Sequence, residues 1–201
     1  MADRKAQLFV VSAPSGAGKT SLLRRLVART ESLQVSVSHT TRAMRTGERE
    51  GKDYFFVDVA AFEAMVARGE FVEHARVFGN LYGTSLLTIN QALAGDSDLV
   101  LEIDWQGARL IRDLYPAAIT VFILPPSLEE LRKRLELRGE DDPEVIDRRM
   151  QAACAEISHY PEYDYLVVNE DFDQASADLA AIVRACRLRT HLSRWAPSPP
   201  P

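Results

Sequence analysis

The sequence feature that most constrains the fold is a tight, glycine-containing turn between an apolar run and an amphipathic segment. Residues 8–13 read LFVVSA, a β-branched run that predicts a buried strand. Residues 19–29 read KTSLLRRLVAR, whose apolar positions recur at helical spacing. The turn at residues 13–20 joins them directly, so a strand, a turn and a helix are expected to form one βα unit.

The turn reads APSGAGKT and fits the phosphate-loop pattern GxxxxGK(S/T), except that Ala13, which must then keep a negative φ, replaces the first glycine. Gly16 and Gly18 allow backbone N–H groups to surround phosphates at the positive end of the following helix. Lys19 is expected to contact the β and γ phosphates, and the Thr20 hydroxyl to ligate Mg²⁺. The residues predicted to bind the triphosphate are Ala13, Pro14, Ser15, Gly16, Ala17, Gly18, Lys19 and Thr20. The loop alone leaves kinase, switch and ATPase functions open.

Three further apolar runs predict buried strands of the same sheet. They are LVLEID at residues 99–104, AITVFIL at 118–124 and YLVV at 165–168. Helical stretches separate them, as parallel βαβ units require. The predicted fold is therefore an α/β fold with a central parallel sheet that is flanked by helices.

Two segments interrupt this pattern. Residues 38–84 are polar, punctuated by glycine and contain short aromatic runs, which predicts an inserted mixed β/α lobe. Residues 127–151 are dense in charge, with helical patterning on both sides of the acidic turn GEDDPE, which predicts a helical lid. The proline-rich end at residues 191–201 is predicted to be disordered. The core is expected to comprise residues 1–37, 85–126 and 152–190.

Composition narrows the functional classes. With 201 residues, of which 46 % are hydrophobic, the chain can bury a core of its own. No apolar stretch approaches the roughly 20 residues that span a bilayer, and the start MADRKAQ lacks a secretory signal, so a cytoplasmic location is expected. A net charge of −5 argues against a nucleic-acid or membrane partner. Of the 24 basic residues 20 are arginine, whose guanidinium suits phosphate, although codon bias explains the excess equally well.

Cysteine and histidine show no disulfide or metal-binding pattern. Cys154 and Cys186 are too few for a disulfide framework and are expected to be small core hydrophobes. The four histidines lack metal-ligand spacing, so any metal is expected to be a hard cation held by oxygen and substrate phosphate. An apolar stripe from Leu179 to Leu188 fits either a subunit contact in a homo-oligomer or a face turned toward the core.

A second cluster suited to phosphate lies in the polar segment SVSHTTRAMRTGE at residues 36–48. Arg42 and Arg45 can clamp one dianionic group through charge-assisted hydrogen bonds. The hydroxyls of Ser38 and Tyr54 can complete the hydrogen-bond shell of that group. This grouping indicates a site for the phosphate of a nucleoside monophosphate.

In seven strings the chain resembles the guanylate kinase family, and its bacterial members in particular, over roughly residues 8–190. The strings are SAPSGAGKT, VSHTTRAMRTGE, GKDYFFV, FVEHARVFGNLYGTS, LEIDWQG, FILPPS and HYPEYDYLVVNEDFD. The resemblance implies a P-loop NTPase fold and a cytoplasmic enzyme of purine metabolism. It also implies transfer of the γ-phosphoryl group of Mg-ATP to GMP, giving ADP and GDP, with residues 38–84 and 127–151 closing over the core to exclude water.

The resemblance further implies roles in the acceptor site. Glu73 is expected to accept from guanine N1–H and the 2-amino group, and because adenine lacks both donors on that edge, such a carboxylate favours guanine. Thr84 is expected to bond guanine O6, and Ser38 to reach the base or the phosphate. The residues expected around the phosphate are Arg42, Arg45, Tyr54 and Tyr82.

Two acids end a buried strand at the carboxyl edge of the predicted sheet, where ligands bind in open α/β folds. The family commonly has aspartate at both positions, one near Mg²⁺ and one near guanine. Here Glu102 is assigned to the metal together with Thr20, and Asp104 to guanine. The reverse assignment and a structural role for either acid stay open.

Arginines of the charged hairpin are expected by resemblance to close over the triphosphate and neutralise the transferred group. The alternative is a solvated helix face on which Glu130 pairs with Arg134. Asn169 resembles a position near the ATP base or ribose. The catalytic cations implied by the resemblance are Lys19, Arg42, Arg134, Arg138 and Arg149.

Two other functions share part of these motifs. A kinase for ribose bisphosphates would share the phosphate loop but not the combination of Glu73 with Thr84. A scaffold domain that binds phosphorylated peptides would share the fold but lack a working loop or the guanine-reading residues. Acceptor preference separates the first from a GMP kinase, and ATP binding separates the second.

Overall fold

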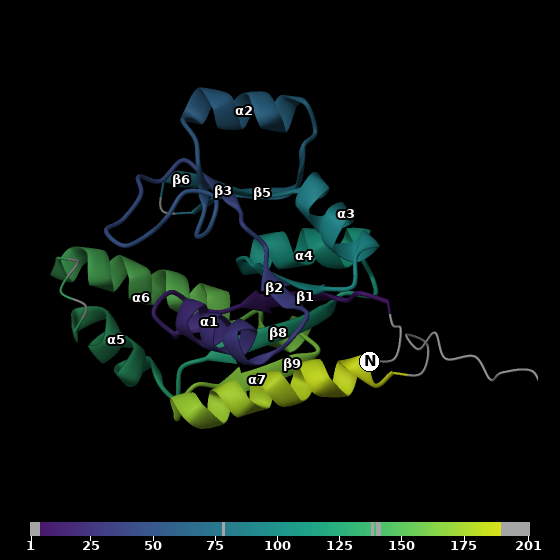
Figure 1. Cartoon of the computed structure of the whole chain (residues 1–201). Coiled ribbons are helices and arrows are strands. Elements are labelled where there is room, and N and C mark those ends of the chain that lie inside the picture. Colours follow the sequence, from purple (N-terminus) through teal and green to yellow (C-terminus); the bar gives the residue numbers. More distant parts are fainter. Residues whose placement is uncertain (1–4, 78, 138, 140–141, 190–201) are drawn as a thin grey trace, which may run out of the picture.

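A five-stranded parallel sheet lies at the centre of the computed structural model, which describes residues 5–77, 79–137, 139 and 142–189 (Figure 1). The strand order is β2-β7-β1-β8-β9, and every pairing is parallel. The strands are β1 (Leu8–Ser12), β2 (Leu33–Val35), β7 (Asp98–Glu102), β8 (Ile119–Leu124) and β9 (Tyr165–Val168). The predicted α/β fold with a central parallel sheet is confirmed. Of these strands only β2 was not predicted, because it is short and carries a polar residue, Gln34, at its centre.

Helices cover both faces of this sheet. On one face lie α1 (Lys19–Arg29) and α7 (Phe172–Arg187), and on the other lie α3 (Leu86–Ala94) and α4 (Trp105–Leu114). Strand β1 supplies both layers, because its side chains alternate: Phe9 packs toward α1 and α7, and Val10 toward α3 and α4. Such doubly covered strands explain why β1 is buried along its whole length.

The apolar stripe of α7 faces the core. Leu179 and Val183 are buried in the layer that contains Phe9, so the core-facing interpretation is confirmed for these residues, whereas Leu188 at the end of the stripe is exposed. Cys186 is buried in the same layer as expected, whereas Cys154 is exposed on its helix, and the expectation of burial was wrong there. Within the described part of the chain, no helix has the length and apolarity that a membrane span requires.

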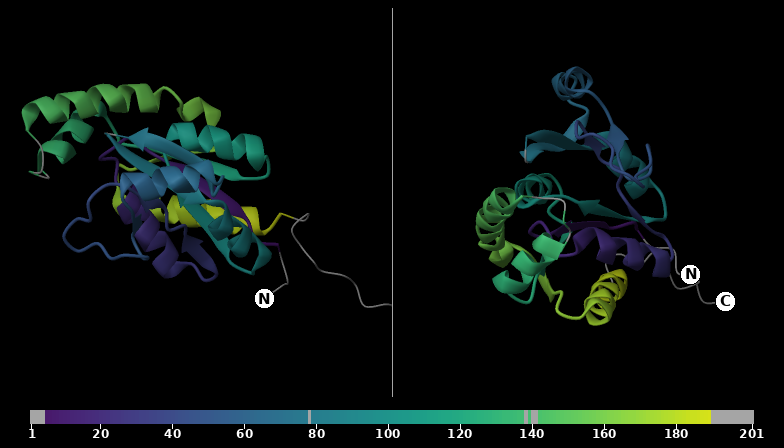
Figure 2. Two further views of the ribbon diagram at one scale, coloured as in Figure 1. Left: turned by 90° about the horizontal axis from the view of Figure 1, so that it is seen from above. Right: turned by 90° about the vertical axis from the view of Figure 1, so that its left-hand side faces the viewer.

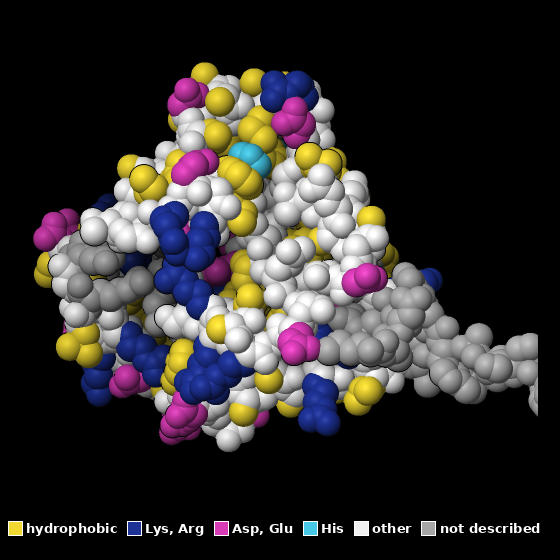
Figure 3. Space-filling model, in the orientation of Figure 1, with side chains coloured by type: hydrophobic (Ala, Val, Ile, Leu, Met, Phe, Trp, Pro, Cys, Tyr) yellow, Lys and Arg dark blue, Asp and Glu magenta, His cyan; other side chains and the backbone are white. Residues whose placement is uncertain are grey.

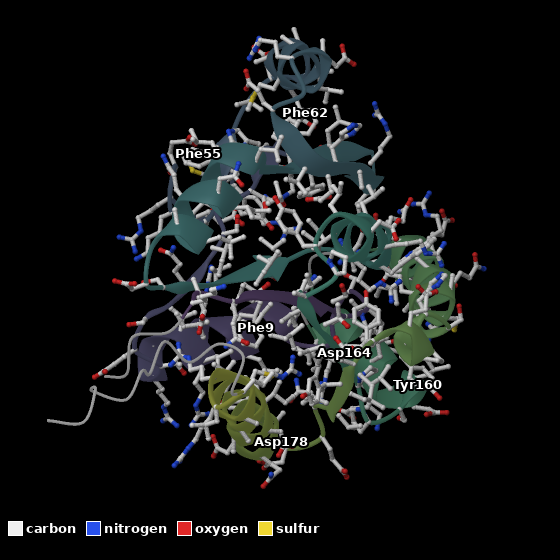
Figure 4. The ribbon with its side chains drawn as sticks, turned by 90° about the vertical axis from the view of Figure 1, so that its right-hand side faces the viewer. Phe9, Phe55, Phe62, Tyr160, Asp164 and Asp178 are labelled. Carbon is white, nitrogen blue, oxygen red and sulfur yellow. The ribbon has the colours of Figure 1, made fainter. Side chains whose placement is uncertain are left out.

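A second, four-stranded sheet lies above α4 in Figure 1, and Figure 2 shows α4 between the two sheets. Its order is β4-β3-β6-β5, with one parallel pair and two antiparallel pairs. Helix α2 (Val59–Ala67) covers its outer face, and Figure 4 shows Phe62 between this helix and the sheet. The ring of Phe62 stacks on Phe71 at 4.6 Å between centroids. Its strands are β3 (His39–Thr40), β4 (Phe55–Phe56), β5 (Phe71–Val77) and β6 (Asn80–Ser85).

A helical hairpin of α5 (Leu128–Leu137) and α6 (Pro143–Ile157) lies at one end of the core (Figure 1). Both helices follow the helical patterning on either side of the acidic turn. Leu131 and Leu135 turn inward and are fully buried. A short 3-10 turn, η1 (Tyr160–Glu162), connects α6 to β9. Arg138 and residues 191–201 lie outside the described residues, and the division into core, lobe and lid stays a prediction.

Candidate active site

The phosphate loop leaves β1 and enters α1 through two glycines with left-handed backbone. Gly16 has φ of 93° and Gly18 has φ of 92°, a region that side chains disfavour. Among the described residues Ser32 alone combines a side chain with a positive φ, so Ala13 keeps a negative φ as expected. The Ala17 N–H donates to Pro14 O at 3.1 Å, which closes the turn. The left-handed glycines and the negative φ of Ala13 are therefore compatible with a phosphate loop, and phosphate binding by this loop stays a prediction.

Strand pairing brings the loop to the carboxyl end of β7. Because Val11 pairs with Glu102, α1 begins beside that carboxylate. The Thr20 hydroxyl donates to Glu102 Oε1 at 2.5 Å, and Lys19 Nζ donates to Ile103 O at 3.2 Å. Two protein oxygens side by side fit Mg²⁺, which usually takes one or two protein ligands and completes its shell with water and substrate phosphate. The described residues contain no cluster of three His, Cys, Asp or Glu for a metal held by protein alone.

Asn169 braces the loop from the end of β9. Its side-chain Nδ2 donates to Ala17 O at 2.8 Å, and only 5 % of the residue is exposed. A Cβ on Gly18 would lie 2.5 Å from this nitrogen, so the glycine is required for space as well as for its backbone. Arg134 of α5 donates to Asn169 O at 3.1 Å and lies 3.5 Å from Glu130, which makes both the predicted pair and a link to β9.

The hairpin helices also approach the loop directly. A Cβ on Gly16 would lie 2.9 Å from Leu135 Cδ2, so α5 packs against the turn. Glu156 of α6, which sequence reasoning missed, is near Ser15 and Lys19. Burial raises the pKa of Glu156, while Lys19 and the Ser15 N–H favour its charged form. Arg149 is half-buried on the same helix. No local pattern singles out Glu156, since its neighbours in the loop are distant in sequence.

Three predicted guanine-site residues form a buried polar chain in the second sheet. Thr84 of β6 donates through Oγ1 to Glu73 Oε1 of β5 at 2.5 Å, and the Ser38 hydroxyl lies 3.4 Å from Thr84 Oγ1. The exposed fractions are 4 % for Glu73 and 0 % for Thr84. Burial raises the pKa of Glu73 to about 7, and the nearby Asp104 carboxylate raises it further against the hydrogen bond from Thr84.

Asp104 stands at the N-terminus of α4, between the two sheets. Its Oδ1 accepts from Gly107 N–H at 2.9 Å, so it is the N-cap of the helix. Asp104 also lines a cavity of about 230 Å³ together with Trp105, Arg76 and Glu156. The cavity thus connects the N-terminus of α4 with the end of β5 and the side of α6. Asp104, which is predicted to contact guanine, lines this cavity, and so does Glu156, which is near Ser15 and Lys19 of the phosphate loop.

The predicted phosphate clamp lies in the loop after β3. Arg42 Nη2 donates to both carboxylate oxygens of Glu48, at 2.7 and 3.0 Å, and Arg45 N–H donates to Glu48 Oε2 at 2.8 Å. The Arg42 guanidinium lies 5.4 Å from the ring centroid of Tyr54, whose ring is 6.0 Å from that of Tyr82. All four predicted residues therefore gather here. Glu48 ends the segment SVSHTTRAMRTGE, but no role was predicted for it from the sequence. Its position three residues after Arg45 was the local signal that pointed to this contact.

The same loop reaches the core at α1. Arg24 Nη2 pairs with Asp53 Oδ1 at 2.7 Å, and Asp53 Oδ2 accepts from Arg49 N–H at 2.9 Å. Figure 3 shows basic side chains gathered where this loop approaches α1. This ion pair links the loop that carries Arg42 and Arg45 to the helix that follows the phosphate loop.

Comparison with known proteins agrees with this geometry. The model of the guanylate kinase family matches residues 5–186. The guanylate kinase of Alkalilimnicola ehrlichii is 60 % identical over 182 residues, which cover 90 % of each chain. The guanylate kinase of Hahella chejuensis is 56 % identical over 185 residues, covering 92 % of this chain and 89 % of that one.

A solved structure leads to the same family. The crystal structure of guanylate kinase from Anaplasma phagocytophilum is 37 % identical and superposes with a TM-score of 0.77, covering 96 % of this chain and 91 % of that one. The similarity thus extends over nearly the whole chain, in sequence and in three dimensions. The chain belongs to the guanylate kinase family.

Proposed function

We propose that this protein transfers the γ-phosphoryl group of Mg-ATP to the phosphate of GMP, giving ADP and GDP, in the cytoplasm. The observation that carries the proposal is the buried pair of Glu73 and Thr84 in the second sheet, 2.5 Å apart, beside Asp104. A carboxylate whose charge is disfavoured by burial gains strongly from two N–H donors. Guanine offers two such donors on one edge, and adenine offers neither there.

The acceptor phosphate would be bound by Arg42, Arg45, Tyr54 and Tyr82. The contact of Arg42 Nη2 with both carboxylate oxygens of Glu48 helps to hold the guanidinium in one orientation, and the aromatic ring of Tyr54 lies under it. A pre-oriented guanidinium loses less entropy when it binds a dianion. Ser38, which lies next to Thr84, would complete the base side of the same site.

The donor triphosphate would be bound by residues 13–20. The backbone N–H groups of the loop and the N-terminus of α1 would attract its phosphates, and Lys19 would contact the β and γ groups. Thr20 Oγ1 and Glu102 would hold Mg²⁺, with Asp104 left to guanine. The ion, when bound, would neutralise charge on the phosphates. Asn169 would border the donor site through its contact with Ala17.

Catalysis would consist of positioning and charge stabilisation. The attacking oxygen belongs to GMP, so no side chain needs to act as a nucleophile. Lys19, Arg42, Arg134, Arg138 and Arg149 would surround the transferred group with positive charge. Movement of the second sheet and of the α5–α6 hairpin toward the core would exclude water. The contact of Arg24 in α1 with Asp53 supports an approach of the inserted segment to the core.

The alternatives are less well supported. The Glu73–Thr84 pair favours guanine over a ribose bisphosphate as the acceptor, and the intact loop with Lys19 and Thr20 favours catalysis over a scaffold role. GMP and ATP are the proposed partners. Neither a nucleic-acid nor a membrane partner is proposed, since the net charge is −5. A homo-oligomer is compatible with the fold.

ADP production with Mg-ATP and GMP, AMP, CMP, UMP or no acceptor tests the proposal. We expect turnover that depends on GMP, with little from the other acceptors. Glu73→Gln should weaken the GMP reaction, whereas Glu63→Gln, an exposed carboxylate on α2, should leave it unchanged. Equal turnover with several acceptors would leave a P-loop kinase of another substrate. No turnover together with a failure to bind ATP would point to a binding role.

A further inference from the structure

A glycine in the first turns of α4 lies against the carboxylate of Glu73. A Cβ built on Gly107 would lie 2.8 Å from Glu73 Oε2 and 3.2 Å from Glu73 Cδ. Side chains do not approach so closely, so any residue other than glycine would have to displace the carboxylate. The two groups come from helix α4 and strand β5, which pack against each other in the space between the sheets.

The backbone does not explain this glycine. Gly107 lies inside α4 and is not among the glycines with positive φ. In such a position alanine stabilises a helix by about 1 kcal/mol relative to glycine. A residue that weakens its own helix while its missing Cβ adjoins a buried carboxylate points to a requirement for space.

The opposite side of the carboxylate is also occupied. Glu73 Oε1 accepts from Thr84 Oγ1 at 2.5 Å, and Thr84 is fully buried. Glu73 is therefore held between a hydroxyl on β6 and the bare backbone of Gly107. A methyl group at residue 107 would rotate the carboxylate away from Thr84 or force α4 and β5 apart.

Gly107 also contacts the second acid of the proposed guanine site. Its N–H donates to Asp104 Oδ1 at 2.9 Å. One residue thus orients Asp104 through its N–H and makes room for Glu73 by lacking a side chain. We propose that Gly107 is a specificity-determining positioning residue, which sets the two carboxylates that read the guanine edge of GMP. This inference rests on the proposed function.

The test compares Gly107→Ala with Gly95→Ala, in steady-state kinetics with GMP and with AMP. Gly95 is the control because it ends α3 with φ of −95° and its Cβ would meet no atom closer than 3.5 Å. We expect Gly107→Ala to raise KM for GMP at least about tenfold and to leave KM for ATP and the low AMP rate unchanged. Its melting temperature should also fall, because the methyl group overpacks the site, so the readout that a purely structural role would not give is the rise of KM for GMP alone. Gly95→Ala should match the wild type in every reading.

The Glu73→Ala background makes the test specific to the proposed contact. There the clash is gone, so adding Gly107→Ala should change KM for GMP by less than about twofold, and the double variant should fold even if Gly107→Ala alone does not. An unchanged KM in the single variant, or an equal rise in both backgrounds, would overturn the inference alone. A wild type that does not prefer GMP would overturn the proposed function and the inference with it.

Discussion

The two sheets bury different kinds of side chain. In the parallel sheet, β1 is buried along its length and the neighbouring strands are mostly aliphatic. The buried carboxylate of this sheet, Asp98 of β7, accepts from Arg187 at 2.8 Å and from Gln7 N–H at 2.8 Å. In the second sheet the buried acid is Glu73, which accepts a hydroxyl and whose pKa is raised by burial to about 7. The first arrangement stabilises the fold, and the second leaves binding capacity for a ligand.

Glu73→Gln should separate recognition from stability most strongly. We expect kcat/KM for GMP to fall about 1000-fold, because an amide cannot accept from both guanine donors. At pH 8 the free energy of unfolding of the variant should be about 2 kcal/mol higher than that of the wild type, because the wild type then carries a buried charge that the folded state disfavours. Chemical denaturation beside the kinetic assay measures both. A loss of stability at pH 8 would contradict the contrast drawn between the sheets.

Arg187→Met should have the opposite pattern. The change removes the guanidinium from Asp98, which has 0 % exposure, and should lower the free energy of unfolding by about 3 kcal/mol. Values of kcat/KM measured below the unfolding transition should stay within about twofold, because the residue is remote from the site. Arg184→Met, an exposed arginine on the same helix, is the control. A stability change as small as that of the control would contradict a structural role of the ion pair between Asp98 and Arg187.

The pH dependence of kcat/KM for GMP should report Glu73. Its pKa in the free protein is raised from 4.5 to about 7, so the carboxylate that guanine requires is lost as pH falls below 7. We expect about a tenfold decrease per pH unit there. Stability should change in the opposite sense: the folded state holds a proton that the unfolded state has released between pH 4.5 and 7, so this group makes stability fall as pH rises through that window.

Glu73→Gln is also the control for that profile. The phosphate of the substrate GMP titrates near pH 6, as phosphate monoesters do, and it affects the assays of both proteins equally. The decrease between pH 7 and pH 6.5 should therefore disappear in the variant. Identical profiles in the two proteins would assign the titration to the substrate or to another group.

Arg24→Ala should give the smallest effect. This ion pair with Asp53 joins the two parts of the molecule on the surface, with 67 % of the Arg24 side chain exposed. Exposed pairs contribute about 0.5 kcal/mol, so stability should hardly change and KM for GMP should rise about twofold. The rise should shrink at high salt. Arg29→Ala, at the exposed end of α1, is the matched control, and a tenfold effect from Arg24→Ala would show a larger part in closure.

The local sequence determined the elements that carry the chemistry. The spacing of glycines in residues 13–20, the apolar run before them and the helical period after them predicted the phosphate loop, and α1 spans the predicted residues 19–29. The aliphatic runs predicted four of the five parallel strands. The resemblance of the motifs to the guanylate kinase family then indicated which residues form the candidate acceptor and donor sites. These signals are local, because hydrogen bonding within a turn and burial of one helix face depend on residues close in sequence.

Only the tertiary structure decided which of those residues meet. Thr20 contacts Glu102 across 82 positions, Asn169 braces a loop 152 positions away, and Gly107 adjoins Glu73 because α4 packs on β5. Strand order and register create these contacts, and a periodic pattern is compatible with many orders. For the same reason the sequence did not show that Gly107 leaves space for Glu73. Packing between α4 and β5 decides which side chain lies next to residue 107, and the sequence near that residue does not encode this packing.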